Sequence, residues 1–324
     1  MRGGTRVLAG IDIGGTKTAF ALGERQGDEI AASWRRATEP TQDASADLLR
    51  MADDVRTLLE EAGLAPGELE AVGVSAAGPL DPGQGVLLEP PNLPWHRAPV
   101  VGVLSQALGC PVFLDNDANA AALAEWLYGA GRGTRHMVYL TMSTGVGAGL
   151  VLDGRIHRGV ACSAGEVGHV PVVWDGEPCS CGMRGCLEAY VGGAAWTRRL
   201  VEHTPPSSRV AALTPAGATP RPEQVVLAAR EGDAFALSEL ARFNDYLARG
   251  IVQVAFTLAP ELVVLGTIPT AAGEALCLDP VREQVHARLW PVIGDGLRIE
   301  ASGLGESLPD YAGLSVAREG LARS

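Results

Sequence analysis

One histidine and three cysteines stand close together in the chain, at a spacing that suits a metal ion. They are His169, Cys179, Cys181 and Cys186. One imidazole and three thiolates make a closed tetrahedral site for Zn²⁺, and a metal with four protein ligands keeps no open position for a substrate. We therefore expect a structural zinc ion that fixes the loop over residues 166–188. The alternative is that the thiols are unbound or that two of them form a disulfide.

Two glycine-rich segments have the composition of phosphate-binding turns. The first contains Asp12, Gly14, Gly15, Thr16 and Lys17, and the second contains Ser143, Thr144, Gly145 and Gly147. Glycines leave backbone N–H groups uncovered for a phosphate, and a carboxylate beside them can hold Mg²⁺. Neither segment fits the P-loop or the dinucleotide-binding pattern. One such turn is often only a turn, but two of them, each between two strands, indicate a nucleotide clamped between hairpins, as in actin-like ATPases.

Asn116 and Asp117 stand at an expected strand-to-helix corner, in the stretch LDNDANAAA. The side chain of Asn116 can cap the helix, and the helix dipole favours the ionised form of Asp117. The alternative is that both residues are caps and nothing more. A parallel sheet, however, places ligands at the carboxyl ends of its strands. Asp117 is therefore our candidate for the group that accepts a proton from a hydroxyl in phosphoryl transfer, a reaction for which a weak base suffices.

The hydrophobic periodicity predicts alternating strands and helices, and hence an α/β fold. Strands are expected over residues 7–15, 69–75, 111–115, 137–141, 150–152 and 261–266, with a strand pair over 19–36 and a glycine turn over 143–149. Helices are expected over residues 44–62, 118–128, 193–202, 223–230, 234–258, 279–288 and 311–322. Each half begins with a strand, a glycine turn and a second strand. This repetition predicts two lobes of the same plan that face each other across a cleft.

We expect the lobes to divide the chain near residue 115. Residues 1–115 would form a small α/β lobe, on which a C-terminal helix over about 311–324 packs. Residues 116–310 would form a larger α/β lobe that carries the metal loop. Within it, residues 203–222 are rich in Pro, Ser, Thr and Ala, and they are expected to be a mobile surface insertion that does not pack.

Length, charge and hydropathy narrow the possible classes of function. The 324 residues exceed the size of most single domains. A net charge of −12 offers no basic surface to nucleic acid or to an anionic membrane. No apolar run is long enough to span a membrane, and the N-terminus lacks the pattern of a signal peptide. We expect a cytoplasmic protein in which Cys110, Cys162 and Cys277 are buried, reduced thiols.

Five segments together resemble the ROK family, the bacterial sugar kinases and sugar-responsive repressors of the actin-like ATPase superfamily. They are GIDIGGTK, LDNDANAAA, TGVGAG, GEVGH and CSCGMRGCLE, and the resemblance extends from Gly10 to about Arg288. It implies a two-lobed, ribonuclease H-like fold with a structural zinc site, and ATP bound with Mg²⁺. It also implies that Asp117 is the base that takes the proton from the 6-hydroxyl of a sugar.

The resemblance implies roles for further residues. Gly78, Asn92, Asn116, Glu166, His169 and Glu188 would contact the sugar, with His169 serving both zinc and sugar. Asp12 would lie near Mg²⁺ and the γ-phosphate, and Gly266 would lie on the adenine side. There the family usually has two or three glycines, whereas this chain continues with Thr267 and Ile268. This departure leaves ATP, ADP and polyphosphate open as phosphoryl donors.

The sequence thus predicts an ATP-dependent hexokinase of bacterial carbohydrate metabolism, a homodimeric glucokinase at the entry to glycolysis. The alternatives among enzymes are a kinase for N-acetylglucosamine or N-acetylmannosamine and a fructokinase, because the same residues contact hydroxyls that these sugars share. A non-catalytic, sugar-sensing regulator is the alternative of another class. Such a regulator normally has an N-terminal pair of DNA-binding helices, and we expect no room for one here, because the first phosphate motif begins ten residues into the chain.

Overall fold

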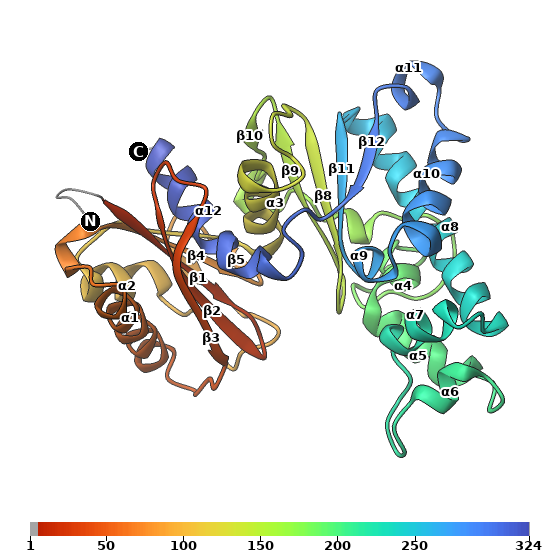
Figure 1. Cartoon of the computed structure of the whole chain (residues 1–324), viewed down its shortest axis with the longest axis horizontal. Coiled ribbons are helices and arrows are strands. Elements are labelled where there is room, and N and C mark those ends of the chain that lie inside the picture. Colours follow the sequence, from red (N-terminus) through yellow and green to blue (C-terminus); the bar gives the residue numbers. More distant parts are fainter. Residues whose placement is uncertain (1–5, 324) are drawn as a thin grey trace. The chain divides into compact units, whose positions relative to one another are not determined.

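The computed structural model describes residues 6–323, which fold into two compact α/β units (Figure 1). The first unit contains residues 6–132, the short segment Ile156–Ala164 and residues 306–323. The second unit contains Gly133–Arg155 and Gly165–Gly305. This division differs from the boundary that we expected near residue 115, because the helix that follows packs against the C-terminal helix of the first unit.

The sheet of the first unit has five strands in the order β3-β2-β1-β4-β7. They are β1 (Val7–Ile13), β2 (Lys17–Glu24), β3 (Ile30–Ala37), β4 (Leu69–Ala76) and β7 (Val112–Asn116). Strands β1, β2 and β3 are antiparallel neighbours, whereas β4 and β7 run parallel to β1. The register pairs Asp12 with Ser75 and Ser75 with Asp115. The carboxyl ends of β1, β4 and β7 therefore lie side by side at one edge of the sheet.

Helices cover both faces of this sheet (Figure 1). They are α1 (Ala44–Glu61), α2 (Val100–Leu108), α3 (Asp117–Tyr128) and α12 (Leu308–Arg323). Helix α1 begins at the cap Asp43, whose side chain accepts from the N–H of Ala46, and its apolar stripe, which includes Leu48 and Val55, is buried against the sheet. We had not predicted α2. The hairpin of β5 (Leu80–Asp81) and β6 (Val86–Leu87) completes the unit.

Helix α12 approaches strands β1 and β4 so closely that glycines are required on both sides. A Cβ atom on Gly73 would lie 2.0 Å from the carbonyl oxygen of Gly313, and one on Gly10 would lie 2.5 Å from the nitrogen of Leu314. Distances below 3 Å exclude any side chain. The contact is sealed by a small apolar cluster that includes Leu8, Ala71 and Leu314. The C-terminal helix is thus an integral part of the first unit.

The sheet of the second unit repeats the strand plan of the first, in the order β10-β9-β8-β11-β12. Its strands are β8 (Met137–Met142), β9 (Val146–Leu152), β10 (Arg155–Ile156), β11 (Leu262–Thr267) and β12 (Arg298–Ala301). Strands β8 and β9 are antiparallel, whereas β11 is parallel to both β8 and β12. The expected glycine turn over 143–149 is shorter than predicted, because β9 already begins at Val146. Strand β12 was not predicted.

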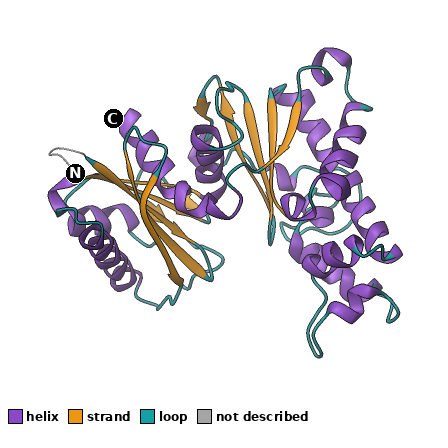
Figure 2. Cartoon of the chain, in the orientation of Figure 1, coloured by secondary structure: helices purple, strands orange, loops and turns teal. Residues whose placement is uncertain are grey.

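The helices of the second unit follow the loop over residues 166–188, which we call the zinc loop, and they lie beside the sheet (Figure 2). They are α4 (Glu188–Val191), α5 (Gly193–His203), α6 (Arg209–Leu213), α7 (Pro222–Arg230), α8 (Ala234–Leu258), α9 (Ile268–Ala272), α10 (Asp279–His286) and α11 (Pro291–Gly294). Helix α6 lies inside the stretch that we expected not to pack. The side chain of Val210 is fully buried there, and the hydroxyl of Ser208 donates to Asp233 at 3.1 Å. That expectation is wrong for residues 208–213 because these contacts attach them to α8.

Among residues 6–323, no helix combines the length and the apolar character needed to cross a membrane.

Candidate functional site

Asp117 is the first residue of α3 and stands where strand β7 ends. The side chain of Asn116 caps the helix, since its Oδ1 accepts from the N–H of Ala118 at 2.9 Å. Oδ1 of Asp117 accepts from the same N–H, also at 2.9 Å. Although Asp117 is solvent-exposed, the surrounding protein desolvates its carboxylate and raises its pKa, against the opposing effect of the Ala118 N–H. The result is a carboxylate that is more basic than one in free solution.

Asp117 shares a cavity of about 110 Å³ with the first glycine turn. The lining includes Asp12, Gly14, Gly15 and Asn92, all within the first unit. The structure therefore brings together two carboxylates, one amide and the uncovered backbone of a glycine turn. This set can bind a hydroxyl beside a phosphate, because the carboxylates accept from the hydroxyl and the N–H groups donate to phosphate oxygens.

The turn itself is tightly closed. The N–H of Gly14 donates to the carbonyl of Lys17 at 3.1 Å, and a Cβ on Gly14 would lie 2.7 Å from that oxygen. Thr38 supports the turn from β3's end, donating its hydroxyl to the carbonyl of Gly14 at 2.8 Å and its N–H to that of Thr16 at 2.9 Å. Gly15, Thr16 and Lys17 are exposed to solvent. A ligand can therefore reach this turn and the ammonium group of Lys17.

Gly78 lies beside the same corner. A Cβ atom at this position would come within 3.5 Å of Nδ2 of Asn116, and the peptide bond to Pro79 is cis. Gly78 does not line the cavity of Asp117, whereas its neighbour Ala77 does. The backbone of this segment therefore forms a surface next to the cap of α3.

The carboxylate of Asp12 lies beneath the turn and is partly buried. Burial raises its pKa to about 6, and the charge of Asp117 acts in the same direction, while a hydrogen bond from Ser75 and the charge of Arg35 act against it. The hydroxyl of Ser75 donates to Asp12 at 2.6 Å. Ser75 had not been identified from the sequence. The available signal was its place on β4, directly opposite Asp12 in a parallel pair.

We expect Asp12 to make the stability of the metal-free protein depend on pH. The folded state binds this proton up to about pH 6 and the unfolded state only up to about 3.8, so stability falls as the pH rises between these values. The cost above pH 6 is at most about 3 kcal/mol. Asp12→Asn removes it, so the Tm difference between variant and wild type should grow between pH 4.5 and 6.5 and then stay constant. Thermal unfolding without divalent cations measures this, and a difference that is independent of pH would contradict it.

A buried ion network fixes the corner from below. The carboxylate of Asp115 accepts from the backbone N–H of Asn116 at 2.9 Å and from the guanidinium of Arg158 at 2.6 Å. Arg158 also forms a bidentate pair with Glu319 of α12, at 2.8 and 3.3 Å. Side-chain exposure is 1% for Asp115 and 14% for Arg158, so both charges are paired away from solvent. The segment Ile156–Ala164 and helix α12 thereby hold the start of α3 in place.

The predicted metal ligands come together in the second unit. One ligand atom from each of His169, Cys179, Cys181 and Cys186 lies within 4.8 Å of all the others. The sulfur atoms of Cys181 and Cys186 are 3.7 Å apart, and Nδ1 of His169 is 3.6 Å from the sulfur of Cys179. Tetrahedral Zn²⁺ bonds imply about 3.8 Å between two sulfurs and about 3.6 Å between sulfur and nitrogen. The residues therefore fit zinc, and none of the six cysteines forms a disulfide.

Two glutamates flank this cluster. Oε2 of Glu166 lies 3.9 Å from Nε2 of His169, whereas the other ring nitrogen, Nδ1, is the one near the sulfur of Cys179. Glu188 joins two segments, since Oε1 accepts from the hydroxyl of Ser180 and Oε2 accepts from the N–H of Val146, both at 3.0 Å. A Cβ on Gly145 would lie 2.5 Å from Oε2 of Glu188. The zinc loop is thus tied to the second glycine turn.

A larger cavity, of about 1120 Å³, opens beside the second glycine turn. Its lining includes Ser143, Thr144 and Thr267, apolar side chains of α7 and α9, and three arginines, Arg198, Arg221 and Arg230. A cavity of this size, with an apolar wall and cationic groups, can hold a nucleotide. Of the other expected nucleotide contacts, Gly147 lies within strand β9, and Gly266 is buried in β11, where a Cβ would lie 2.3 Å from the hydroxyl of Tyr139.

The chain matches the model of the ROK family over residues 8–307. A glucokinase of Thermotoga maritima is 35% identical over 319 residues, which are 96% of this chain and 97% of the relative. Among solved structures, a ROK hexokinase from Thermus thermophilus has a TM-score of 0.83 at 30% identity and covers 98% of this chain and 100% of its own. A ROK glucokinase from Streptomyces griseus, in complex with glucose and AMPPNP, has a TM-score of 0.77 at 30% identity. The match covers 97% of this chain and 99% of the glucokinase chain.

Repressors are also among the relatives. A xylose repressor of Bacillus subtilis is 26% identical over 95% of this chain and 76% of its own length. The predicted fold class, two mixed α/β sheets in a two-unit, actin-like architecture, is confirmed by these likenesses.

Proposed function

The chain belongs to the ROK family, and from that premise we propose that it is an ATP-dependent hexokinase that phosphorylates the 6-hydroxyl of glucose. One observation carries the proposal. The carboxylate of Asp117, with its raised pKa, lines the same cavity as Asp12 and the first glycine turn. A base and a phosphate-binding turn in one cavity are what transfer of a phosphoryl group to a hydroxyl requires. The glucokinase relatives support the choice of sugar.

Asp117 would accept the proton of the attacking hydroxyl and align its oxygen. We assign contacts with the other hydroxyls to Asn116, to Asn92 and to the backbone at Gly78. From the second unit we assign Glu166, His169 and Glu188, whose acceptors are ordered by the zinc loop. Ionised acceptors make strong hydrogen bonds to hydroxyl groups, so their placement selects the stereochemistry of the sugar.

The donor would be ATP bound with Mg²⁺. We assign its base and ribose to the larger cavity and its phosphates to the turn at Ser143, Thr144 and Gly145. Lys17 and the turn at Gly14 to Thr16 would bind the transferred phosphoryl group, and Asp12 would hold Mg²⁺, directly or through water. Zinc, with four protein ligands, supplies no chemistry of the reaction and stabilises the loop that carries the glutamates. We place such an enzyme in the cytoplasm, as a homodimer.

A sugar-sensing regulator is the second candidate, because xylose repressors are among the relatives. N-acetylglucosamine kinase, N-acetylmannosamine kinase and fructokinase remain alternatives within the same chemistry.

A panel of sugars separates these candidates. Glucose, mannose, fructose, N-acetylglucosamine and N-acetylmannosamine would each be assayed with ATP and Mg²⁺, and the product position would be determined by NMR. We expect glucose to have the highest kcat/KM, by about tenfold or more, a difference of about 1.4 kcal/mol in transition-state binding, with the phosphate on the 6-hydroxyl. ADP and polyphosphate would be tested as donors in parallel. Stabilisation by a sugar without turnover of any would favour the regulator.

A further inference from the structure

The loop over residues 90–96 is attached to helix α1 by a buried hydrogen bond. The indole N–H of Trp95 donates to Oδ2 of Asp47 at 2.9 Å. Both residues are almost completely buried, with 3% of Trp95 and 2% of Asp47 exposed. A hydrogen bond to an ionised carboxylate in such surroundings is among the stronger ones in proteins. It connects two segments that are 48 residues apart in the chain.

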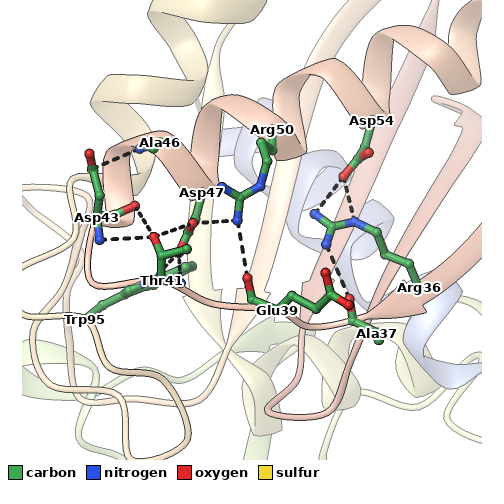
Figure 3. A network of polar contacts seen from close by, with 10 residues as sticks. All are labelled: Arg36, Ala37, Glu39, Thr41, Asp43, Ala46, Asp47, Arg50, Asp54 and Trp95. Carbon is green, nitrogen blue, oxygen red and sulfur yellow. Dashed lines mark hydrogen bonds and ion pairs between the residues drawn. The ribbon is translucent and has the colours of Figure 1, made fainter.

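Asp47 is the centre of a larger network (Figure 3). Thr41 donates both its N–H and its hydroxyl to the carboxylate, at 2.7 and 2.9 Å, and Arg50 donates at 2.6 Å. Burial tends to raise the pKa of Asp47, but the donors Thr41 and Trp95 and the charge of Arg50 outweigh it, and the pKa is lowered. The carboxylate is therefore ionised and its oxygens are fully engaged. The indole N–H of Trp95 therefore donates to a carboxylate that other hydrogen bonds hold in place.

The loop that Trp95 anchors forms one wall of the cavity that contains Asp117. Pro90, Asn92 and Leu93 line this cavity together with the two carboxylates. Asn92 also rests on the first glycine turn, since a Cβ on Gly15 would lie 2.6 Å from the Cβ of Asn92. A displacement of the loop would therefore change both the width of the cavity and the position of the Asn92 amide.

From this geometry we infer that Asp47 and Trp95 are positioning residues for the sugar acceptor. They hold residues 90–96 as a fixed wall, so that Asn92 stands at a set distance from Asp117 before the sugar arrives. Preorganisation of this kind lowers the free energy needed to order the site on binding. The inference rests on the proposed hexokinase function, and the experiment below distinguishes the failure of one from the failure of the other.

Trp95→Phe is the test, and Trp34→Phe is its matched control. Both changes shorten a tryptophan to phenylalanine in the first unit, but Nε1 of Trp34 has no hydrogen-bond partner within the described residues, and its ring stacks on Phe20. We expect Trp95→Phe to raise the KM for glucose about tenfold, since it removes a charge-assisted hydrogen bond. Trp34→Phe should change it by less than about twofold, and neither variant should alter binding of a non-hydrolysable ATP analogue to the sugar-free enzyme by more than about twofold.

Amide hydrogen exchange provides a readout that does not depend on turnover. The N–H of Leu93 bonds to the carbonyl of Pro90 at 3.2 Å, and that of Arg97 bonds to the carbonyl of Leu88 at 2.7 Å. Both amides should exchange faster in Trp95→Phe than in wild type. In Trp34→Phe their exchange rates should be the same as in wild type. If Trp95→Phe does not fold, Asp47→Asn weakens the same bond by removing the charge of its acceptor.

Equal kinetics of the two tryptophan variants would overturn the inference, as would equal weakening of glucose and nucleotide binding. If the wild type phosphorylates no hexose, the proposed function fails. Faster loop exchange in Trp95→Phe together with weaker glucose binding would then still support the positioning role, and unchanged exchange would overturn it.

Discussion

Asp117→Asn is expected to lower kcat by about 10²- to 10⁴-fold while glucose still binds, because the amide can align the hydroxyl but cannot accept its proton. The change keeps the shape of the side chain. It also keeps the helix, since Asn116 caps α3 independently through the N–H of Ala118. A coupled assay at saturating glucose and ATP gives kcat, and the rise in Tm with added glucose reports binding. Turnover at the wild-type rate would remove Asp117 from the mechanism.

Asp279→Asn is the matched control for this variant. Asp279, in the second unit, carries the same side chain, which is 65% exposed and pairs with neighbouring Arg282. Exposed pairs of this kind contribute about 0 to 1 kcal/mol. We expect no change of kcat in Asp279→Asn, so a loss in Asp117→Asn would not be a general effect of replacing a carboxylate by an amide.

Loss of zinc should weaken glucose binding by about tenfold or more, a loss of at least about 1.4 kcal/mol, and should weaken nucleotide binding much less. The reason lies in the contacts of the zinc loop. The carboxylate of Glu166 lies 3.9 Å from the ring of His169. The carboxylate of Glu188 accepts a hydrogen bond from Ser180, which lies between Cys179 and Cys181 in the chain. Most of the lining of the larger cavity comes instead from α5, α7 and α9, and only Ser143 and Thr144 come from the turn to which the zinc loop is tied.

Chelation of the wild type and the variant Cys181→Ser approach this prediction from two sides. Zinc content is measured by atomic absorption, and binding of glucose and of an ATP analogue by calorimetry. Cys110→Ser is the control, because Cys110 lies in the first unit and outside the cluster. An equal loss of both ligands would mean that the metal holds the whole second unit rather than one loop, and wild-type protein without zinc would contradict the metal site.

The elements that the sequence predicts well are those with a strong local pattern. The apolar stripe of α1 and the cap at Asp43 define that helix, and the largely buried strands β1, β4 and β11 are rich in apolar residues. The local pattern predicts the structure less well at the glycine turn after β8, because Gly147 is compatible with both a turn and a strand. In the structure Gly147 pairs with Thr141 of β8 and therefore belongs to a strand. Helix α6 was missed because its single buried residue, Val210, gives no periodicity.

The metal ligands were predictable because all four lie within one short segment. The supports of the site were not. Arg158 binds Asp115, which is 43 residues away in the chain, and Glu319, which is 161 residues away. Neither ion pair has a signature in the sequence. The sequence marks Asp115 only as the last residue of an expected strand. Such partners are selected by tertiary packing, and they become visible only once the strands and helices are placed.

Helix α12 also constrains the order of events during biosynthesis. It is translated after every strand of both sheets, yet its backbone packs directly against Gly10 and Gly73 in the sheet of the first unit. Until it arrives, Leu8, Ala21 and Ala71 lack their cover on that face. The second unit, whose segments all precede Glu306, can complete its own contacts earlier. The nascent chain therefore carries an uncovered apolar sheet face through most of its elongation, and this face is where a chaperone would be needed.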